Sequence, residues 1–180
     1  MQLTLATAAA LFVIASVANA ATVAQVKDDI TAIDTAVQNL NSHAQTDSLN
    51  YFSGLAIRHA ADEVIAKIKQ GSTDVHALEG APTDAEAKEI ITMLTGTQTK
   101  VKSTVDRMVA LKPEFEKLGV LALSAKSVNE FKDETSNFSA ELVRAAPASQ
   151  KSEANKLASK FNQNLAMCAD AYKAYVIPHR

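Results

Sequence analysis

The sequence predicts an all-α fold, an antiparallel bundle of about five amphipathic helices. Apolar residues recur at spacings of three and four along the chain, and strand-like alternation is scarce. The 180 residues contain only 5 Gly and 4 Pro, the residue types that most disfavour helix interiors. Short connections between apolar stripes favour antiparallel neighbours. Inward-facing stripes of this kind suit either a solid core or an elongated apolar cavity, and the pattern leaves both open.

Five apolar stripes locate the expected helices, at residues 23–40, 57–78, 90–111, 128–145 and 157–175. Thr135 falls in register on the fourth stripe. Residues 41–47 are expected to form a loop. Pro113 cannot continue a helix without a kink, so it is expected to begin a short separate turn that ends at Gly119.

Capping signals support these boundaries. At three expected helix starts a Ser or Thr precedes a Glu or Gln by three residues, as in a capping box: Thr22 with Gln25, Thr83 with Glu86, and Ser127 with Glu130. Gly80 and Pro82 are expected to end the second helix, since glycine commonly follows a helix and proline cannot continue one.

Residues 1–20 have the pattern of a cleaved secretory signal, with an uncharged apolar stretch followed by Ala18-Asn19-Ala20. Residues 21–180 are then expected to form one extracellular helical domain. The net charge is −2 and no basic block is present, which disfavours nucleic-acid binding. A second long apolar run is also lacking, so no transmembrane segment is expected in the mature chain.

No catalytic, metal or cofactor site is expected. No two of the four histidines lie three or four residues apart, and three converging metal ligands cannot be assembled. Adjacent carboxylates such as Asp28 and Asp29 are expected to split between helix faces. Motifs of nucleophilic hydrolases, phosphate-binding loops and zinc proteases are missing. A hydrolase is therefore an alternative that only measured esterase activity would revive.

Two single residues carry separate expectations. Cys168, the sole cysteine, falls on the fifth apolar stripe and is expected to be a buried small hydrophobe rather than half of an intermolecular disulfide. Asn137 begins the sequon Asn137-Phe138-Ser139 and is a candidate for N-glycosylation.

The bulky apolar side chains are the candidate binding residues. They suit an ordinary bundle core, but they also suit a cavity or an opened face that binds oily ligands, since helical bundles are recurrent ligand sites. Burial of an acyl chain contributes about 0.8 kcal/mol per methylene. The candidates, chosen for size and stripe position, are Phe52, Leu55, Leu94, Met108, Phe131, Phe138, Phe161 and Leu165.

An ordered set of segments resembles the fungal hydrophobic surface binding protein A family, which includes cell-wall galactomannoproteins. The segments include Val26–Asp34, Gly54–Ile57, Leu111–Gly119 and Glu141–Val143. The resemblance implies a secreted or wall-associated helical bundle that adsorbs to hydrophobic surfaces or binds lipids such as fatty acids. The resemblance also implies that the protein assists secreted hydrolases. The family has no catalytic residues to carry over to this sequence.

The sequence thus predicts a secreted, non-enzymatic binder of hydrophobic surfaces or lipids. The alternative is a structural cell-wall mannoprotein or a secreted effector that acts through protein contacts and has a solid core.

Overall fold

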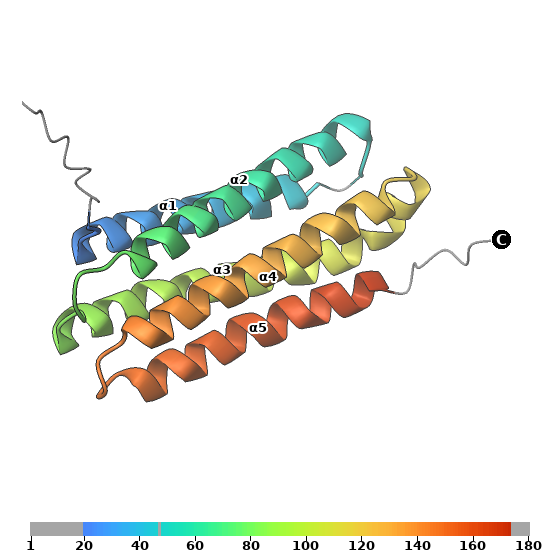
Figure 1. The fold of residues 1–180 in the computed structure, drawn as a ribbon. Helices are drawn as coiled ribbons and strands as arrows, with labels where there is room; N and C mark the ends of the chain where they lie inside the picture. Colours follow the sequence, from blue (N-terminus) through green and yellow to red (C-terminus); the bar gives the residue numbers. More distant parts are fainter. Residues whose placement is uncertain (1–19, 47, 174–180) are drawn as a thin grey trace, which may run out of the picture.

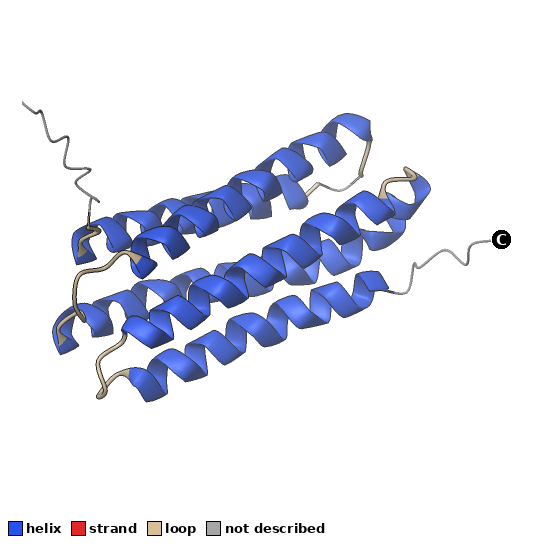
Figure 2. Ribbon diagram, in the orientation of Figure 1, coloured by secondary structure: helices blue, strands red, loops and turns tan. Residues whose placement is uncertain are grey.

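The computed structural model describes residues 20–46 and 48–173, which form a bundle of five long helices (Figures 1 and 2). The described residues contain no strand, only an isolated β-bridge between Ala21 and Leu78. The all-α prediction is confirmed. The helices are α1 Val23–Ala44, α2 Tyr51–His76, α3 Asp84–Lys117, α4 Leu121–Ala145 and α5 Lys151–Lys173. The expected signal, apart from Ala20, and the predicted end of the last helix at Tyr175 lie outside the described residues.

The five helices pack as a closed ring, in the order α1, α2, α4, α5, α3 and back to α1. Sequence neighbours run antiparallel, whereas α1 and α3, or α3 and α5, run in the same direction (Figure 1). Helices α3 and α4 make only slight contact despite their short connection. A regular ring of five helices with axes about 9 Å apart leaves a central gap about 2 Å in radius after the helix radius of about 5–6 Å is subtracted. That gap is close to the half-width of an aliphatic chain, about 2 Å.

Local capping explains where α1, α2 and α3 begin, and Asn50 with Ser53 forms the capping box of α2. Thr83 and Glu86 form the predicted capping box, with the Thr83 N–H donating to Glu86 Oε2 at 2.8 Å. Thr22 caps α1 by accepting from the Gln25 N–H at 3.2 Å. The Gln25 side chain does not complete that box, because it donates to Asp74 on α2 instead.

Two predicted boundaries are wrong, and packing explains both. Residues 41–44 are helical rather than part of a loop, since α1 continues until Ala44 is fully buried. Ser127 does not cap α4, which begins two turns earlier at Leu121, with Val120 as an N-cap that makes no side-chain hydrogen bond. Burial of Leu121 holds these additional turns against the bundle.

The expected break at Pro113 is also wrong, because Pro113 lies inside the continuous helix α3. Proline removes one backbone hydrogen bond and crowds the carbonyl four residues earlier, here that of Val109. Val109 is partly exposed, so water can reach this turn. Leu111 and Phe115 on either side are buried at 4% and 2% exposure. Their packing holds the helix together through the proline. Helix α3 ends at Lys117, and Gly119, the predicted terminating glycine, follows with a φ of +71°.

Candidate ligand-binding site

A cavity of about 60 Å³ lies inside the ring, between side chains from all five helices. We call it the central cavity. On α3 its lining extends from Ala87 to Val101, fourteen residues or about 21 Å along the helix. Its bulkiest lining residues are Phe131, Phe138 and Phe161, and Ile33, Ile68 and Leu94 are among its branched aliphatic ones.

The central cavity approaches solvent at one end of the bundle, which we call the mouth. Half-buried lining residues gather there, around the α2–α3 and α4–α5 connections: Leu78, Leu142, Ala145, Ala146 and Ala154. At the inner end, Val101 and Phe131 are 2% and 8% exposed. The cavity is therefore a narrow, blind space entered from the end at which α3 and α5 begin.

The lining is apolar and uncharged. None of the described residues around the central cavity is Asp, Glu, Lys, Arg or His, and three carry hydroxyl groups: Thr97, Thr135 and Ser139. Such a space suits a hydrocarbon, whereas a charged group placed in it would lose its hydration without compensation. No group of His, Cys, Asp and Glu side chains in the described part of the chain could hold a metal ion.

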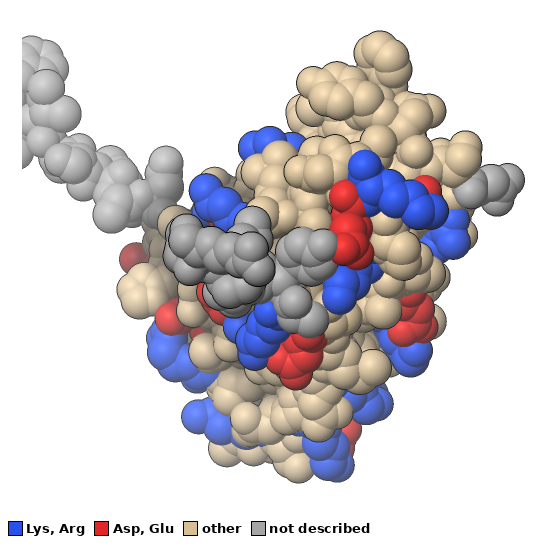
Figure 3. Space-filling view, turned by 90° about the vertical axis from the view of Figure 1, so that its right-hand side faces the viewer, with Lys and Arg blue, Asp and Glu red and all other residues tan. Residues whose placement is uncertain are grey.

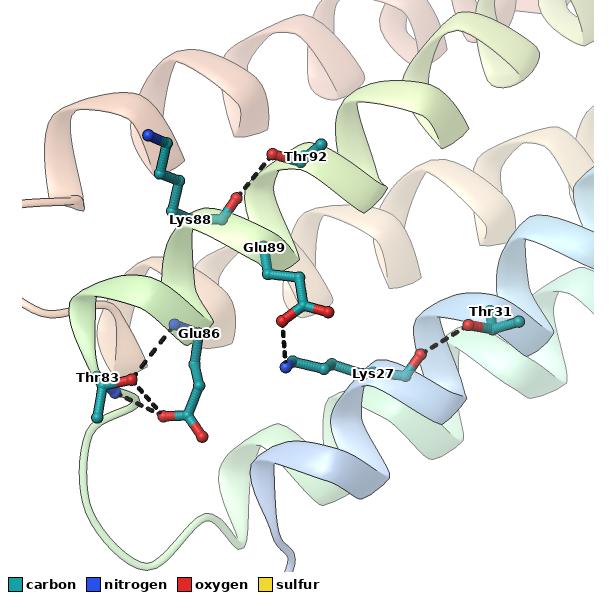
Figure 4. Close-up of polar contacts among 7 residues, drawn as sticks. All are labelled: Lys27, Thr31, Thr83, Glu86, Lys88, Glu89 and Thr92. Atoms are coloured by element: carbon teal, nitrogen blue, oxygen red, sulfur yellow. Dashed lines mark hydrogen bonds and ion pairs between the residues drawn. The ribbon is translucent and has the colours of Figure 1, made fainter.

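Polar contacts lie on α1 and at the start of α3 near the mouth (Figure 4). Lys27 on α1 and Glu89 on α3 form an ion pair with an Nζ–Oε2 distance of 2.5 Å. Hydrogen bonds from Thr83 lower the pKa of Glu86 in the α3 capping box. Glu89 is more than half exposed, and exposed ion pairs contribute about 0–1 kcal/mol. This contact therefore resists separation of α1 from α3 only weakly.

A second cavity, of about 140 Å³, lies toward the opposite end of the bundle between α2, α3 and α4. Leu55, Met108, Phe115, Leu118 and Leu123 are among its lining residues. Beside it, the rings of Tyr51 and Phe52 meet edge to face with centroids 5.8 Å apart, and these side chains are 70% and 79% exposed.

Large apolar side chains are thus concentrated at this end. We call the group the apolar end; it comprises Tyr51, Phe52, Leu55, Leu118 and Leu123, each at least 37% exposed. Figure 3 looks onto this end of the bundle, and uncharged residues form its projecting upper part.

The structure distributes the predicted binding residues over three places. Four line the central cavity: Leu94, Phe131, Phe138 and Phe161. Leu55 and Met108 line the second cavity, and Phe52 lies exposed beside it. Leu165 is 1% exposed in the core and lines neither cavity.

Sequence reasoning did not select the hydroxyl-bearing residues of the central cavity. Thr135 lies in register on an apolar stripe, and that position was the available signal for a polar group facing inward. Nor did sequence spacing reveal that Asp29 on α1 meets Asp74 on α2, because that pair forms only between helices. Burial of Asp29, and then its hydrogen bond with Asp74, raise the pKa of Asp29 to about 6.

The remaining predicted positions are found as follows. Cys168 is free and 2% exposed, which confirms a buried thiol, and burial raises its pKa to about 12.

Asn137 is exposed and lines an open polar groove between α2 and α4, next to Glu134 and Glu141. None of the helices in the described residues is long and apolar enough to cross a membrane.

Solved structures share this five-helix fold. Afmp4p in complex with palmitic acid superposes with a TM-score of 0.80 at 20% identity, over 84% of this chain and 100% of that one. Ligand binding domain 1 of the Penicillium marneffei MP1 protein, complexed with arachidonic acids, has a TM-score of 0.77 at 16% identity over 84% and 99%. Domain 2 of that protein, complexed with multiple arachidonic acids, has a TM-score of 0.77 at 11% identity over 84% and 96%.

Sequence comparison identifies the family. A search of curated proteins finds no match. The sequence model of hydrophobic surface binding protein A matches residues 23–144, from the start of α1 almost to the end of α4. That span includes every helix of the ring except α5. This chain therefore belongs to the hydrophobic surface binding protein A family.

Proposed function

We propose that this protein is a secreted, non-enzymatic lipid binder that takes an acyl chain, such as that of a fatty acid, into the central cavity. One observation carries the proposal: a closed ring of five helices surrounds a space with an uncharged, mostly apolar lining. The structural neighbours support it, since Afmp4p holds palmitic acid and the MP1 domains hold arachidonic acids.

The dimensions of the central cavity define how binding proceeds. A bilayer core about 30 Å thick contains two acyl chains end to end, so one chain needs about 15 Å. The lining on α3 offers about 21 Å, which is long enough. The volume of 60 Å³ is well below the 300–1,000 Å³ of usual ligand pockets. An entering chain must therefore push the helices and the phenylalanine rings apart, against the weak ion pair that joins α1 to α3.

The apolar end supplies a second contact with oily material. Exposed apolar groups of this kind mark interaction sites on soluble proteins. We propose that Tyr51, Phe52 and Leu55 adsorb the protein to hydrophobic surfaces outside the cell, including lipid-bearing cell walls. Secreted hydrolases that act on the same surfaces are the partners that this role would serve.

A ligand titration tests the cavity proposal. Delipidated protein comprising residues 21–180 is melted with and without palmitic acid. At about 100 times the Kd, a ligand that binds only the folded state stabilises it by about 2.7 kcal/mol, which raises Tm by about 5–10 °C for a chain of this size.

Cavity variants make the test specific. Ala158→Phe places a ring in the central cavity and should abolish the rise in Tm, whereas Ala140→Phe on the exposed face of α4 should keep it. Absence of any shift in the wild-type protein, together with no extractable lipid after native purification, would favour a solid-core wall component or effector. Release of product from an acyl ester would favour a hydrolase.

A further inference from the structure

One hydroxyl group in the central cavity lacks a hydrogen-bond partner. Thr135 is 5% exposed, and its Oγ1 is a buried atom with no partner among the described residues. Thr97, which lines the same cavity, donates from its hydroxyl to Asp34 Oδ1 at 2.9 Å. A buried hydroxyl without a partner is unfavourable, and it calls for a group that the protein itself does not provide.

Thr135 also departs from the other helical threonines of this chain. Thr31, Thr73 and Thr104 each donate to the carbonyl four residues earlier, at 2.9–3.0 Å. Threonine usually satisfies its hydroxyl in this way inside a helix. Thr135 makes no such bond to the Phe131 carbonyl. Its hydroxyl is therefore uncommitted, and it belongs to a residue that lines the central cavity.

The hydroxyl-bearing residues Thr135 on α4 and Thr97 on α3 lie at a similar depth in the central cavity. Thr135 lies ten residues from Ala145 at the mouth, and Thr97 lies ten residues from Ala87, which is about 15 Å in each case. This depth equals about one acyl chain, or half of a bilayer core of about 30 Å. Since none of the described residues that line the cavity is a cation, the carboxylate of a fatty acid stays at the mouth. The group that reaches Thr135 is then the far end of the chain.

We propose, building on the function proposed above, that Thr135 makes the central cavity selective for acyl chains with a neutral oxygen near their distal end, such as a terminal hydroxyl group. The Thr135 hydroxyl donates to that oxygen or accepts from it, which satisfies both groups inside an apolar space. Ser139, one turn along α4 and 6% exposed, extends the same hydroxyl-bearing strip toward the mouth.

The test compares the affinities of dodecanoic acid and 12-hydroxydodecanoic acid, whose extended length matches the depth of about 15 Å, measured by calorimetry. Thr135→Val removes the hydroxyl at nearly constant volume, and it should lower the affinity ratio of the hydroxy acid to the plain acid about tenfold. Thr135→Ser keeps the hydroxyl and should keep the ratio. Thr104→Val is the matched control, because Thr104 is equally buried but lies outside the cavity lining.

The outcomes separate the two proposals. An unchanged ratio in Thr135→Val, with both acids still bound, overturns the selectivity and leaves the lipid-binding function intact. A loss of the ratio in Thr104→Val as well overturns the assignment to Thr135. Failure of the wild-type protein to bind either acid overturns the function itself, and the selectivity with it.

Discussion

Replacing Asp29 by Asn should stabilise this protein at neutral pH and leave it unchanged in acid. Asp29 on α1 faces Asp74 on α2, whose carboxylate already accepts from Gln25 and Gln70 at 3.4 and 2.9 Å. Asp29 Oδ2 is buried and receives no hydrogen bond from a donor of the described residues, whereas the Asp29 carboxyl hydrogen-bonds Asp74, which requires a proton between the two carboxyl groups. An asparagine amide can donate to Asp74 in the same place without ionising.

The direction of the stability change follows from the pKa of Asp29, which rises from 3.8 to about 6. Burial is the largest cause, followed by the hydrogen bond with Asp74 and the charges of Asp74 and Asp28. The charge of Lys67 partly offsets these causes. Between these pH values the folded state holds a proton that the unfolded chain has released. The contribution of Asp29 to the free energy of unfolding therefore falls as pH rises from about 4 to 6 and does not change further above that range. The full interval corresponds to about 3 kcal/mol, but Asp29 is only half-buried, and screening by solvent reduces the effect to about 1 kcal/mol.

Urea denaturation followed by circular dichroism measures the effect. At pH 7.5, Asp29→Asn should unfold with about 1 kcal/mol more free energy than the wild-type protein, and at pH 3.5 the two should coincide. Asp28→Asn, at the exposed neighbouring position, is the comparison variant and should show a much smaller pH-dependent gain, because the charge of Asp28 is a lesser cause of the raised pKa of Asp29. An equal difference between Asp29→Asn and wild type at both pH values would refute the account of a protonated carboxyl pair.

Further predictions concern single positions. A Cβ added by Gly96→Ala would meet no atom within 4 Å. This substitution should raise the free energy of unfolding, measured by urea denaturation, by about 1 kcal/mol. Gly71→Ala places Cβ 3.2 Å from the Phe138 ring, which should move into the central cavity, so calorimetry should show weaker palmitic acid binding and little stabilisation. Cys168 should react with a thiol reagent at pH 8 only after unfolding, since its thiol is buried. Phe52→Ser should reduce adsorption to hydrophobic silica while changing stability by less than about 0.5 kcal/mol.

The helices themselves were predictable because their signals are local. The three- and four-residue spacing identified the inward faces, and Thr83 with Glu86 marked the start of α3 as the structure has it. Gly119 likewise has the positive φ of a helix C-terminus. Such signals act within one or two turns, so one sequence window contains all of the interacting groups.

Other features depend on partners that are distant in the sequence. Burial of Leu111 and Phe115 carries α3 through Pro113, and burial of Leu121 starts α4 early without a side-chain cap. In both places, packing against other helices outweighs the local preference. The pairing of Asp29 with Asp74 has the same origin, because neither residue indicates its partner.

The candidate site divides in the same way. The amino-acid sequence by itself determined which side chains are apolar and on which helix face they lie, and so placed Leu94, Phe131, Phe138 and Phe161 on inward faces. Only the tertiary structure decided that α1 closes against α3, and α2 against α4, in a ring. The physical reason is that the apolar side chains of a helix stripe are removed from water equally well in a filled core or around a narrow central gap. The number and order of helices around the axis determine which of the two occurs.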